Sequence, residues 1–246
     1  MEHSRSAAIF AAAFAATGIH GFYEARAVAH DGVRQAFAEL ADGHLEGLNI
    51  TMPHKALAYS LCDRLDTDAA RAGSVNTAVV IDHEIVGYST DIDGIRHCWA
   101  ALPPDRPVLI LGSGGAAAAA AVALTEHEPY ISARRFGAGA ELRERTGVEL
   151  GEIHWGVPVV GANVVNCTPI GMRGEQLPLA VLELAEGLFD MAYGRQTTPA
   201  VSLIREWGKP VVEGLDLLLS QAAYGFRIFT GAEPPLAAMR AAVENS

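Results

Sequence analysis

The second half of the chain alternates short, continuous apolar runs with longer stretches of helical pattern. The apolar run 107–111 leads through a glycine turn into the Ala-rich stretch 115–125, and a second strand is expected at 130–133. Strands that are buried on both faces read as such continuous runs, and their alternation with helices is typical of a parallel sheet covered on both sides. Further strands of this kind are expected at 162–166, 187–191 and 210–213.

The first half has the pattern of a different, mixed α/β unit. Helices are predicted at 6–17, 32–41 and, for the most part, 54–71, and strands at 47–51, 75–81 and 85–89. The segment 215–243 near the C-terminus is again helical in pattern. Between the two halves, 102–107 holds three prolines in six residues, which suits a linker rather than a helix.

We therefore expect an α/β fold of two domains. The first domain is predicted to comprise residues 1–101 together with the returning helices at 216–246. The second is predicted to comprise residues 102–215 and to have the Rossmann-like alternation of strands and helices.

A glycine-rich turn follows the first strand of the second half. The sequence Gly112-Ser113-Gly114-Gly115-Ala116-Ala117 matches G-x-G-x-x-A, the small-residue form of the dinucleotide-binding fingerprint. Gly112 permits the tight turn, Gly114 lets the backbone approach a pyrophosphate, and Ala117 lets the helix pack close to the strand. The alternative is an Ala-rich helix that happens to follow a glycine turn.

The end of the second strand indicates which dinucleotide is bound. An acidic residue there would bind the ribose 2′-hydroxyl of NAD, but the strand ends in Ala133-Arg134-Arg135. Two guanidinium groups suit a 2′-phosphate, through bidentate hydrogen bonds and stacking on the adenine. NADP is therefore the expected cofactor, and a pair of solvated surface arginines is the alternative.

Composition narrows the class of protein further. With 18 basic and 29 acidic residues the net charge is −11, which argues against a nucleic-acid partner. The apolar runs are too short for a membrane span and the N-terminus lacks a signal-peptide pattern, so we expect a cytoplasmic protein with no membrane partner. The three cysteines and nine histidines show no ligand spacing, which predicts buried thiols and no metal site.

Polar residues follow the strands of the first half, where α/β proteins form ligand sites. Thr51 and Lys55 follow the strand at 47–51, Asn76 opens the next one, and Asp91 follows the strand at 85–89. Each has an ordinary alternative role: Lys55 as an exposed first-turn residue, Asp91 as a helix N-cap, and the others as turn residues.

These positions lie in segments that resemble motifs of the shikimate dehydrogenase family. Asn49–Lys55 is similar to N-(V/I)-T-x-P-x-K, and Ser89–Gly94 is similar to N-T-D-x-x-G with Ser in place of Asn. Further resemblances, in the family's order, are at His3–Ser6, Ala72–Thr77, Gly112–Ala117, Asn166–Met172, Asp190–Tyr193 with Thr198 and Pro199, and Gly214–Gln221.

The resemblance implies a monomer or homodimer that reversibly reduces 3-dehydroshikimate to shikimate with NADPH. It implies that Lys55 and Asp91 form the catalytic pair, and we expect the active site to lie in the cleft between the two domains. It places the small-molecule substrate against Ser4, Ser6, Thr51, Asn76, Tyr193 and Gln221. It places NADP against Gly112, Ser113, Gly114, Gly115, Ala116, Ala133, Arg134, Arg135, Thr168, Met191 and Gly214.

The chemistry of the residues supports these roles independently. Ketone reduction needs a proton at the developing alkoxide, which a lysine can give and take back, whereas an arginine stays protonated. Of the 18 basic residues only Lys55 and Lys209 are lysines, so Lys55 departs from the chain's own preference for arginine. Gln221 shares a helix face with leucines, where an amide needs a partner, which favours a role in binding a ligand. Tyr193 could equally be a half-buried residue at a strand end.

The chain departs from the family pattern in two places. The family carries a strand before H-S-x-S, whereas only Met1 and Glu2 precede His3, so we expect an upstream start, a truncated chain or a less stable fold. The family's P-x-x-H-N is here Ala7–Ala11, which together with Ser89 removes polar groups near the substrate. A dehydrogenase of quinate or another polyhydroxylated ring acid, and a non-catalytic nucleotide-binding paralogue, are the alternative functions.

Overall fold

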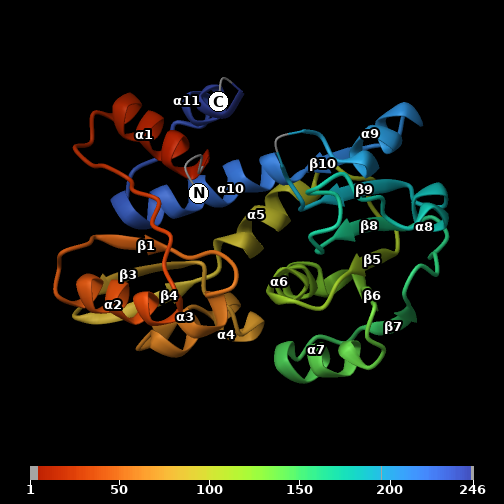
Figure 1. Ribbon diagram of the computed structural model, residues 1–246, viewed down its shortest axis with the longest axis horizontal. Helices are drawn as coiled ribbons and strands as arrows, with labels where there is room; N and C mark the ends of the chain where they lie inside the picture. Colours follow the sequence, from red (N-terminus) through yellow and green to blue (C-terminus); the bar gives the residue numbers. More distant parts are fainter. Residues whose placement is uncertain (1–4, 195, 245–246) are drawn as a thin grey trace. The chain divides into compact units, whose positions relative to one another are not determined.

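The computed structural model describes residues 5–194 and 196–244. The chain divides into two compact units, each an α/β structure with its own sheet (Figure 1). Unit 1 consists of Met1–Ala70, Val75–Thr90 and Leu218–Ser246, and unit 2 of Arg71–Ser74 and Asp91–Leu217. The α/β class with a parallel sheet in the second half is confirmed, and the cleft between the domains stays a prediction.

Unit 1 is built on a four-stranded sheet in the order β1-β3-β4-β2. Its strands are β1 (Gly47–Asn49), β2 (Arg64–Leu65), β3 (Thr77–Ile81) and β4 (Glu84–Tyr88). β3 and β4 form an antiparallel hairpin, and its two turn residues Asp82 and His83 both have positive φ, as a type I′ turn requires. β1 lies at one edge, antiparallel to β3, and β2 lies at the other, parallel to β4.

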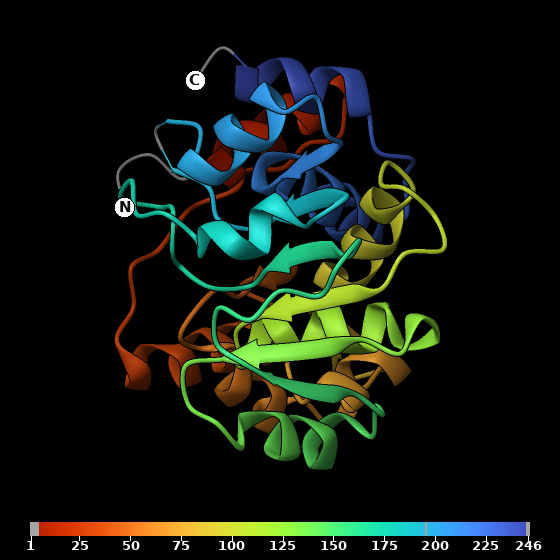
Figure 2. The same cartoon turned by 90° about the vertical axis from the view of Figure 1, so that its right-hand side faces the viewer.

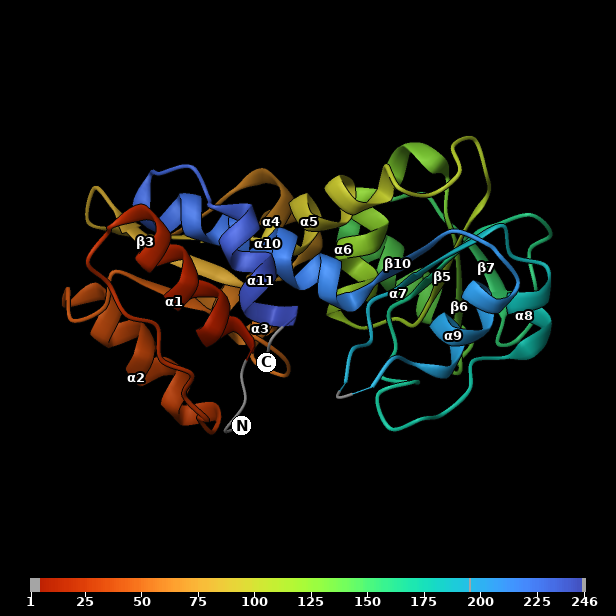
Figure 3. The same cartoon turned by 90° about the horizontal axis from the view of Figure 1, so that it is seen from above.

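Helices cover the sheet of unit 1 on both faces. They are α1 (Arg5–Thr17), α2 (His30–Ala41), α3 (Lys55–Leu61), α4 (Thr67–Ala72), α10 (Gly214–Thr230) and α11 (Leu236–Glu244), of which α4 and α10 each extend into unit 2. Phe37 of α2 and Ala58 of α3 pack with Ala78 of the sheet on one face. On the other, α1 packs along α11, and the buried Phe10 stacks on Tyr23 with ring centroids 4.5 Å apart (Figure 3).

The helix predicted over 54–71 is wrong in its middle. The backbone N–H of Asp63 donates to the carbonyl of Ile85, and the Asp63 carboxylate accepts from the Ile85 N–H, so this segment pairs with the sheet as β2. Asp66 then accepts a hydrogen bond from the Ala69 N–H at 2.7 Å, which begins α4. The predicted helical segment 215–243 is likewise divided into α10 and α11, because Gly231 has positive φ and two prolines follow.

Unit 2 is built on a six-stranded parallel sheet in the order β10-β9-β8-β5-β6-β7 (Figure 2). Its strands are β5 (Val108–Leu111), β6 (Tyr130–Ala133), β7 (Gly151–His154), β8 (Asn163–Asn166), β9 (Gly187–Asp190) and β10 (Val211–Glu213). Its helices are α5 (Thr90–Trp99), α6 (Gly115–Ala123), α7 (Ala138–Thr146), α8 (Leu179–Glu183) and α9 (Pro199–Glu206), with a 3₁₀ turn, η1 (Thr125–His127). The strand order reverses between β5 and β8, the position where doubly wound sheets bind ligands.

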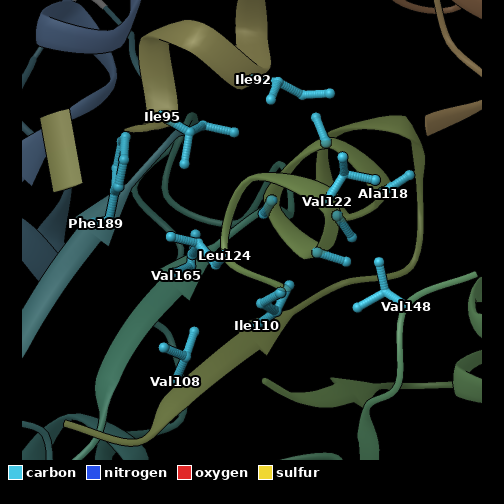
Figure 4. Close-up of a cluster of buried hydrophobic side chains, with 14 of the residues drawn as sticks. Ile92, Ile95, Val108, Ile110, Ala118, Val122, Leu124, Val148, Val165 and Phe189 are labelled. Atoms are coloured by element: carbon cyan, nitrogen blue, oxygen red, sulfur yellow. The ribbon is translucent and has the colours of Figure 1, made fainter. Parts of the chain in front are cut away.

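The core of unit 2 explains where the chain divides. Ile92 and Ile95 of α5 are fully buried against Ile110 of β5 and Val122 of α6 (Figure 4). Because the apolar face of α5 belongs to this core, the main segment of unit 2 begins at Asp91, whereas the proline-rich segment predicts a boundary near residue 102. Within the described part of the chain, no helix is long and apolar enough to cross a membrane.

Candidate active site

The glycine turn joins the buried strand β5 to α6 at the point where the strand order reverses. Gly112 has φ of +118°, and a Cβ there would lie 3.1 Å from the carbonyl oxygen of Cys167 and 3.3 Å from Cγ2 of Thr168. Gly114 is the N-cap of α6 with φ of −82°, and a Cβ there would have no described atom within 4 Å. The two glycines therefore serve different needs. Gly112 allows a backbone conformation and a close approach that a side chain would hinder, whereas Gly114 leaves open space in front of the helix.

The N-terminus of α6 offers what a pyrophosphate needs. The N–H groups of a first helical turn have no acceptor within the helix, and the helix dipole favours an anion there. Gly114 is the N-cap of this helix end, Gly115 and Ala116 are its first residues, and Ser113 precedes the cap; Ala117 is fully buried where α6 packs on the sheet. Together with the open space beside Gly114, these residues fit a dinucleotide.

The end of β6 carries the two arginines that the sequence assigns to a 2′-phosphate, and their surroundings differ. Arg135 forms an exposed bidentate pair with Glu141, in which Nη1 and Nη2 lie 2.5 Å from Oε1 and Oε2, respectively. Arg134 is exposed and makes no side-chain hydrogen bond or ion pair within residues 5–194 and 196–244. Of the two, Arg134 is the one whose donors are not engaged by an acidic residue among those that the structure describes.

The residues predicted as the catalytic pair each begin a helix. Lys55 is the first residue of α3 and is half-buried, and its carbonyl accepts a hydrogen bond from the Val75 N–H at 3.2 Å. Asp91 is the second residue of α5 and its residue surface is 8% exposed. That the two side chains act together stays a prediction.

Asn76 stands at the centre of a buried hydrogen-bond network in unit 1. Its Oδ1 accepts from the Thr90 N–H at 2.8 Å and from the Thr77 hydroxyl at 3.2 Å. Its Nδ2 donates to the Thr90 hydroxyl at 3.0 Å and to Oε1 of Gln221 on α10 at 3.2 Å. The backbone donor at Oδ1 fixes which way the amide faces. Asn76 is therefore more than a turn residue.

The same network fixes what Gln221 can offer a ligand. Its Oε1 is engaged by Asn76, so its two Nε2–H donors are the groups available for another acceptor. Both Nδ2–H donors of Asn76 are engaged by Thr90 and Gln221, so Gln221 is the amide of this network that presents donors, which suit the oxygen atoms of a hydroxylated or ketone-bearing ligand.

The other predicted residues are spread over both units. Ser6 is half-buried on α1, Thr51 is exposed after β1, and Tyr193 is 40% exposed after β9. Ser4 lies outside the described residues. Met191 and Gly214 adjoin each other, since a Cβ on Gly214 would lie 2.7 Å from the Met191 carbonyl oxygen.

A second buried network, to which the sequence pattern assigns no role, lies at the carboxyl ends of β8 and β9. The fully buried Asp190 carboxylate accepts from Asn166 Nδ2 at 2.7 Å, from the Ala192 N–H at 3.1 Å and from the Thr198 hydroxyl at 2.5 Å. Burial raises the pKa of the Asp190 carboxyl, and these three hydrogen bonds oppose the rise. Asn166 and Asp190 each end an apolar strand and each begin a segment that resembles a family motif, and these are the sequence signals that point to them.

The cysteines are free thiols in the structure. Cys167, beside the glycine turn, donates from Sγ to Sδ of Met191 at 3.2 Å, and burial raises the pKa of its thiol. Burial also raises the pKa of Cys62 to about 11. These thiols are held in the protonated, unreactive form, as the sequence predicts for structural cysteines.

Comparison with known proteins identifies the family. Residues 1–78 match the model of the shikimate dehydrogenase substrate binding domain, and residues 214–244 match that of the shikimate 5'-dehydrogenase C-terminal domain. A shikimate dehydrogenase (NADP(+)) of Geobacter sp. strain M21 is 32% identical over 99% of this chain and 91% of its own length. One from Archaeoglobus fulgidus is 35% identical over 98% of this chain and 94% of its own. The chain belongs to the shikimate dehydrogenase family.

Solved structures of shikimate dehydrogenases have the same fold. The Thermus thermophilus enzyme, in complex with NADP(H) and shikimate, matches with a TM-score of 0.89 and 30% identity, over 99% of this chain and 95% of that one. A shikimate dehydrogenase in complex with NADP+ matches with a TM-score of 0.90 and 28% identity, over 99% and 91%. The resemblance read from the motifs is confirmed, while the roles of individual residues in this shikimate dehydrogenase family member stay predictions.

Proposed function

We propose that the protein catalyses the reversible, NADPH-dependent reduction of 3-dehydroshikimate to shikimate. The observation that carries this proposal is that relatives named as NADP(+) shikimate dehydrogenases match nearly the whole chain. The Thermus thermophilus enzyme of the same fold was solved with both NADP(H) and shikimate. We further propose that the enzyme acts in the cytoplasm as a monomer or homodimer.

In this proposal NADP binds along the carboxyl edge of the sheet in unit 2. The turn at Gly112 to Ala116 holds the pyrophosphate, and Ala133 with Arg134 and Arg135 holds the adenosine 2′-phosphate. Thr168, Met191 and Gly214 complete the cofactor site. NADPH, when bound, supplies the hydride. The uncommitted donors of Arg134 and the open space beside Gly114 support this arrangement.

The chain itself supplies the proton and the substrate contacts. We assign proton transfer at the reacting oxygen to Lys55, with Asp91 holding its ammonium group or sharing its proton. The substrate is bound by hydroxyl and amide groups: Ser4, Ser6, Thr51, Asn76, Tyr193 and Gln221. The Nε2 donors of Gln221, whose Oε1 is engaged by Asn76, support this assignment, because the ring acid offers oxygen acceptors. The proposed domain that binds substrate is 1–101 with 216–246, and the proposed domain that binds NADP is 102–215.

Initial rates test the proposal directly. The purified protein is mixed with shikimate or quinate and with NADP or NAD, and the nicotinamide absorbance is followed. We expect turnover with shikimate and NADP to exceed that of the other three pairs. Faster turnover of quinate would instead indicate the related activity. No turnover of any pair, together with retained NADPH binding, would identify a non-catalytic nucleotide-binding paralogue.

A further inference from the structure

The two oxygens of the Asp190 carboxylate anchor different segments of unit 2. Oδ1 accepts from Asn166 and from the Ala192 N–H, while Oδ2 accepts from the Thr198 hydroxyl. Asp190 is fully buried, so it cannot itself touch a bound dinucleotide. Whatever it contributes to binding must pass through the residues it holds.

One branch runs through Asn166 to the loop that follows β8. Asn166 Nδ2 donates to Asp190 and also to the Ile170 carbonyl at 3.0 Å. Its Oδ1 accepts from the Thr168 N–H at 3.0 Å and from the Thr168 hydroxyl at 2.6 Å. The Thr168 hydroxyl in turn accepts from the Ile170 N–H at 3.2 Å. Because a carboxylate only accepts hydrogen bonds, Asp190 forces Nδ2 toward itself and leaves Oδ1 for Thr168.

This loop lies directly against the glycine turn. The Cys167 N–H donates to the Leu111 carbonyl at 2.9 Å, which continues the pairing of β8 with β5. Thr168 Cγ2 and the Cys167 carbonyl oxygen are the atoms nearest to the Cβ position of Gly112, at 3.3 and 3.1 Å. A shift or rotation of Thr168 would therefore alter the wall of the turn on which the pyrophosphate is proposed to rest.

The other branch makes no hydrogen bond to the loop after β8 within the described residues; Thr198 touches that loop only by packing, since a Cβ on Gly171 would lie 3.1 Å from its Cβ and Cγ2, and valine keeps this contact. Thr198 is the N-cap of α9, and its hydroxyl accepts from the Val201 N–H at 3.3 Å while it donates to Asp190. Like Asn166, Thr198 is buried and donates one hydrogen bond to the Asp190 carboxylate. Unlike Asn166, it makes no hydrogen bond to Thr168. Thr198 is thus a matched control within the same network.

We propose that Asp190 is a positioning residue for dinucleotide binding: through the amide of Asn166 it orients Thr168 and holds its loop against the Gly112 turn. The inference rests on the proposed function. It adds a residue that lies out of reach of the ligand and acts through two others, one of which, Asn166, is also fully buried.

The test exchanges the two partners. Asn166→Asp keeps the size and the acceptors for Thr168 but sets two carboxylates against each other. The double exchange Asn166→Asp with Asp190→Asn restores one donor facing one acceptor between positions 166 and 190, but it sets the new amide N–H against the Ala192 N–H and leaves the Ile170 carbonyl without its donor. Thr198→Val removes the hydroxyl of the control branch without changing its shape. The dissociation constant of NADPH is measured by nicotinamide fluorescence, which needs no turnover, and the melting temperature of each unliganded protein is measured alongside.

We expect Asn166→Asp to weaken NADPH binding about tenfold, equivalent to about 1.4 kcal/mol. The double exchange should recover part of that loss, and Thr198→Val should bind NADPH like the parent although it melts at lower temperature. Asn166→Ala, expected to weaken binding about fivefold, carries the same test if Asn166→Asp does not fold. Unchanged NADPH binding in a folded Asn166 variant, or equal losses in Asn166→Asp and Thr198→Val, would overturn the inference.

Failure of the inference and of the proposed function can be told apart. A parent protein that binds NADPH and turns over shikimate, with an Asn166 variant that binds equally well, refutes only the role of Asp190. A parent protein that neither binds NADPH nor turns over shikimate refutes the proposed function, and the inference with it.

Discussion

Alanine at the two glycines of the β5–α6 turn should separate a folding defect from a binding defect. At Gly112 the φ of +118° is unfavourable for any L side chain, and the new Cβ would lie 3.1 Å from a backbone carbonyl oxygen that cannot move freely. Strain of this kind amounts to about 1–3 kcal/mol. We therefore expect Gly112→Ala to lower the melting temperature by about 5–10 °C, given the usual shift of a few degrees per kcal/mol for a chain of this size.

Gly114→Ala should behave in the opposite way. Its φ of −82° is open to alanine and its Cβ would meet no described atom within 4 Å. The gain from a less flexible unfolded chain, about 0.4–1 kcal/mol, roughly offsets the poorer N-cap. Stability should stay unchanged, but the methyl group would occupy the space into which a pyrophosphate must come, so we expect the KM for NADPH to rise at least about tenfold, or about 1.4 kcal/mol.

Two measurements on each variant decide the matter: thermal melting by circular dichroism without ligand, and initial rates against NADPH concentration. We expect opposite results for the two variants: Gly112→Ala should change mainly the melting temperature, and Gly114→Ala only the KM for NADPH. A folded Gly114→Ala protein with the parent KM would show that the dinucleotide does not approach this backbone. An unchanged melting temperature for Gly112→Ala would show that the turn relaxes without strain.

Three further predictions concern side chains of the proposed site. Lys55→Ala should lower kcat by at least about 100-fold, as loss of a general acid does, with unchanged NADPH binding by fluorescence; a variant that keeps its rate would remove Lys55 from the mechanism. Arg134→Ala should raise the KM for NADPH about tenfold but not that for NADH. Arg135→Ala should raise the KM for NADPH less, because Glu141 holds that guanidinium; a larger effect of Arg135→Ala than of Arg134→Ala would contradict the assignment. Gln221→Glu, which keeps the acceptor for Asn76 but loses the Nε2 donors, should raise the KM for shikimate and leave that for NADPH unchanged in the same rate assay.

Several features could be read from short stretches of sequence because their physical causes are local. The four-residue apolar strand β5, the glycine turn and the Ala-rich helix α6 lie next to one another in the chain, and spacing alone sets their order. The parallel character of the sheet followed from its apolar runs. By contrast, the hydrophobic pattern predicts neither β7 nor α7. The strand β7 is half-exposed and carries Glu152 and His154 in place of an apolar run.

The networks needed the tertiary structure, because their members are distant in sequence. Asn76 and Gln221 are separated by 145 positions, and Asn166 and Asp190 by 24. A sequence can show that each residue is polar and ends or follows an apolar run, but hydrogen bonding depends on which atoms meet. Only the folded chain decides that Asn76 faces Gln221 with its donor, and that Arg135 pairs with Glu141 while Arg134 pairs with no described acid.

The sequence by itself determined the family, the α/β class, the dinucleotide turn and the identity of the residues that can do the chemistry. The tertiary structure decided where the units divide, how 54–71 and 215–243 break, and how each buried amide is oriented. The physical reason is the range of the forces involved. Turn conformation and hydrophobic periodicity act between neighbours in the chain, whereas burial and hydrogen-bond direction are properties of groups brought together by folding.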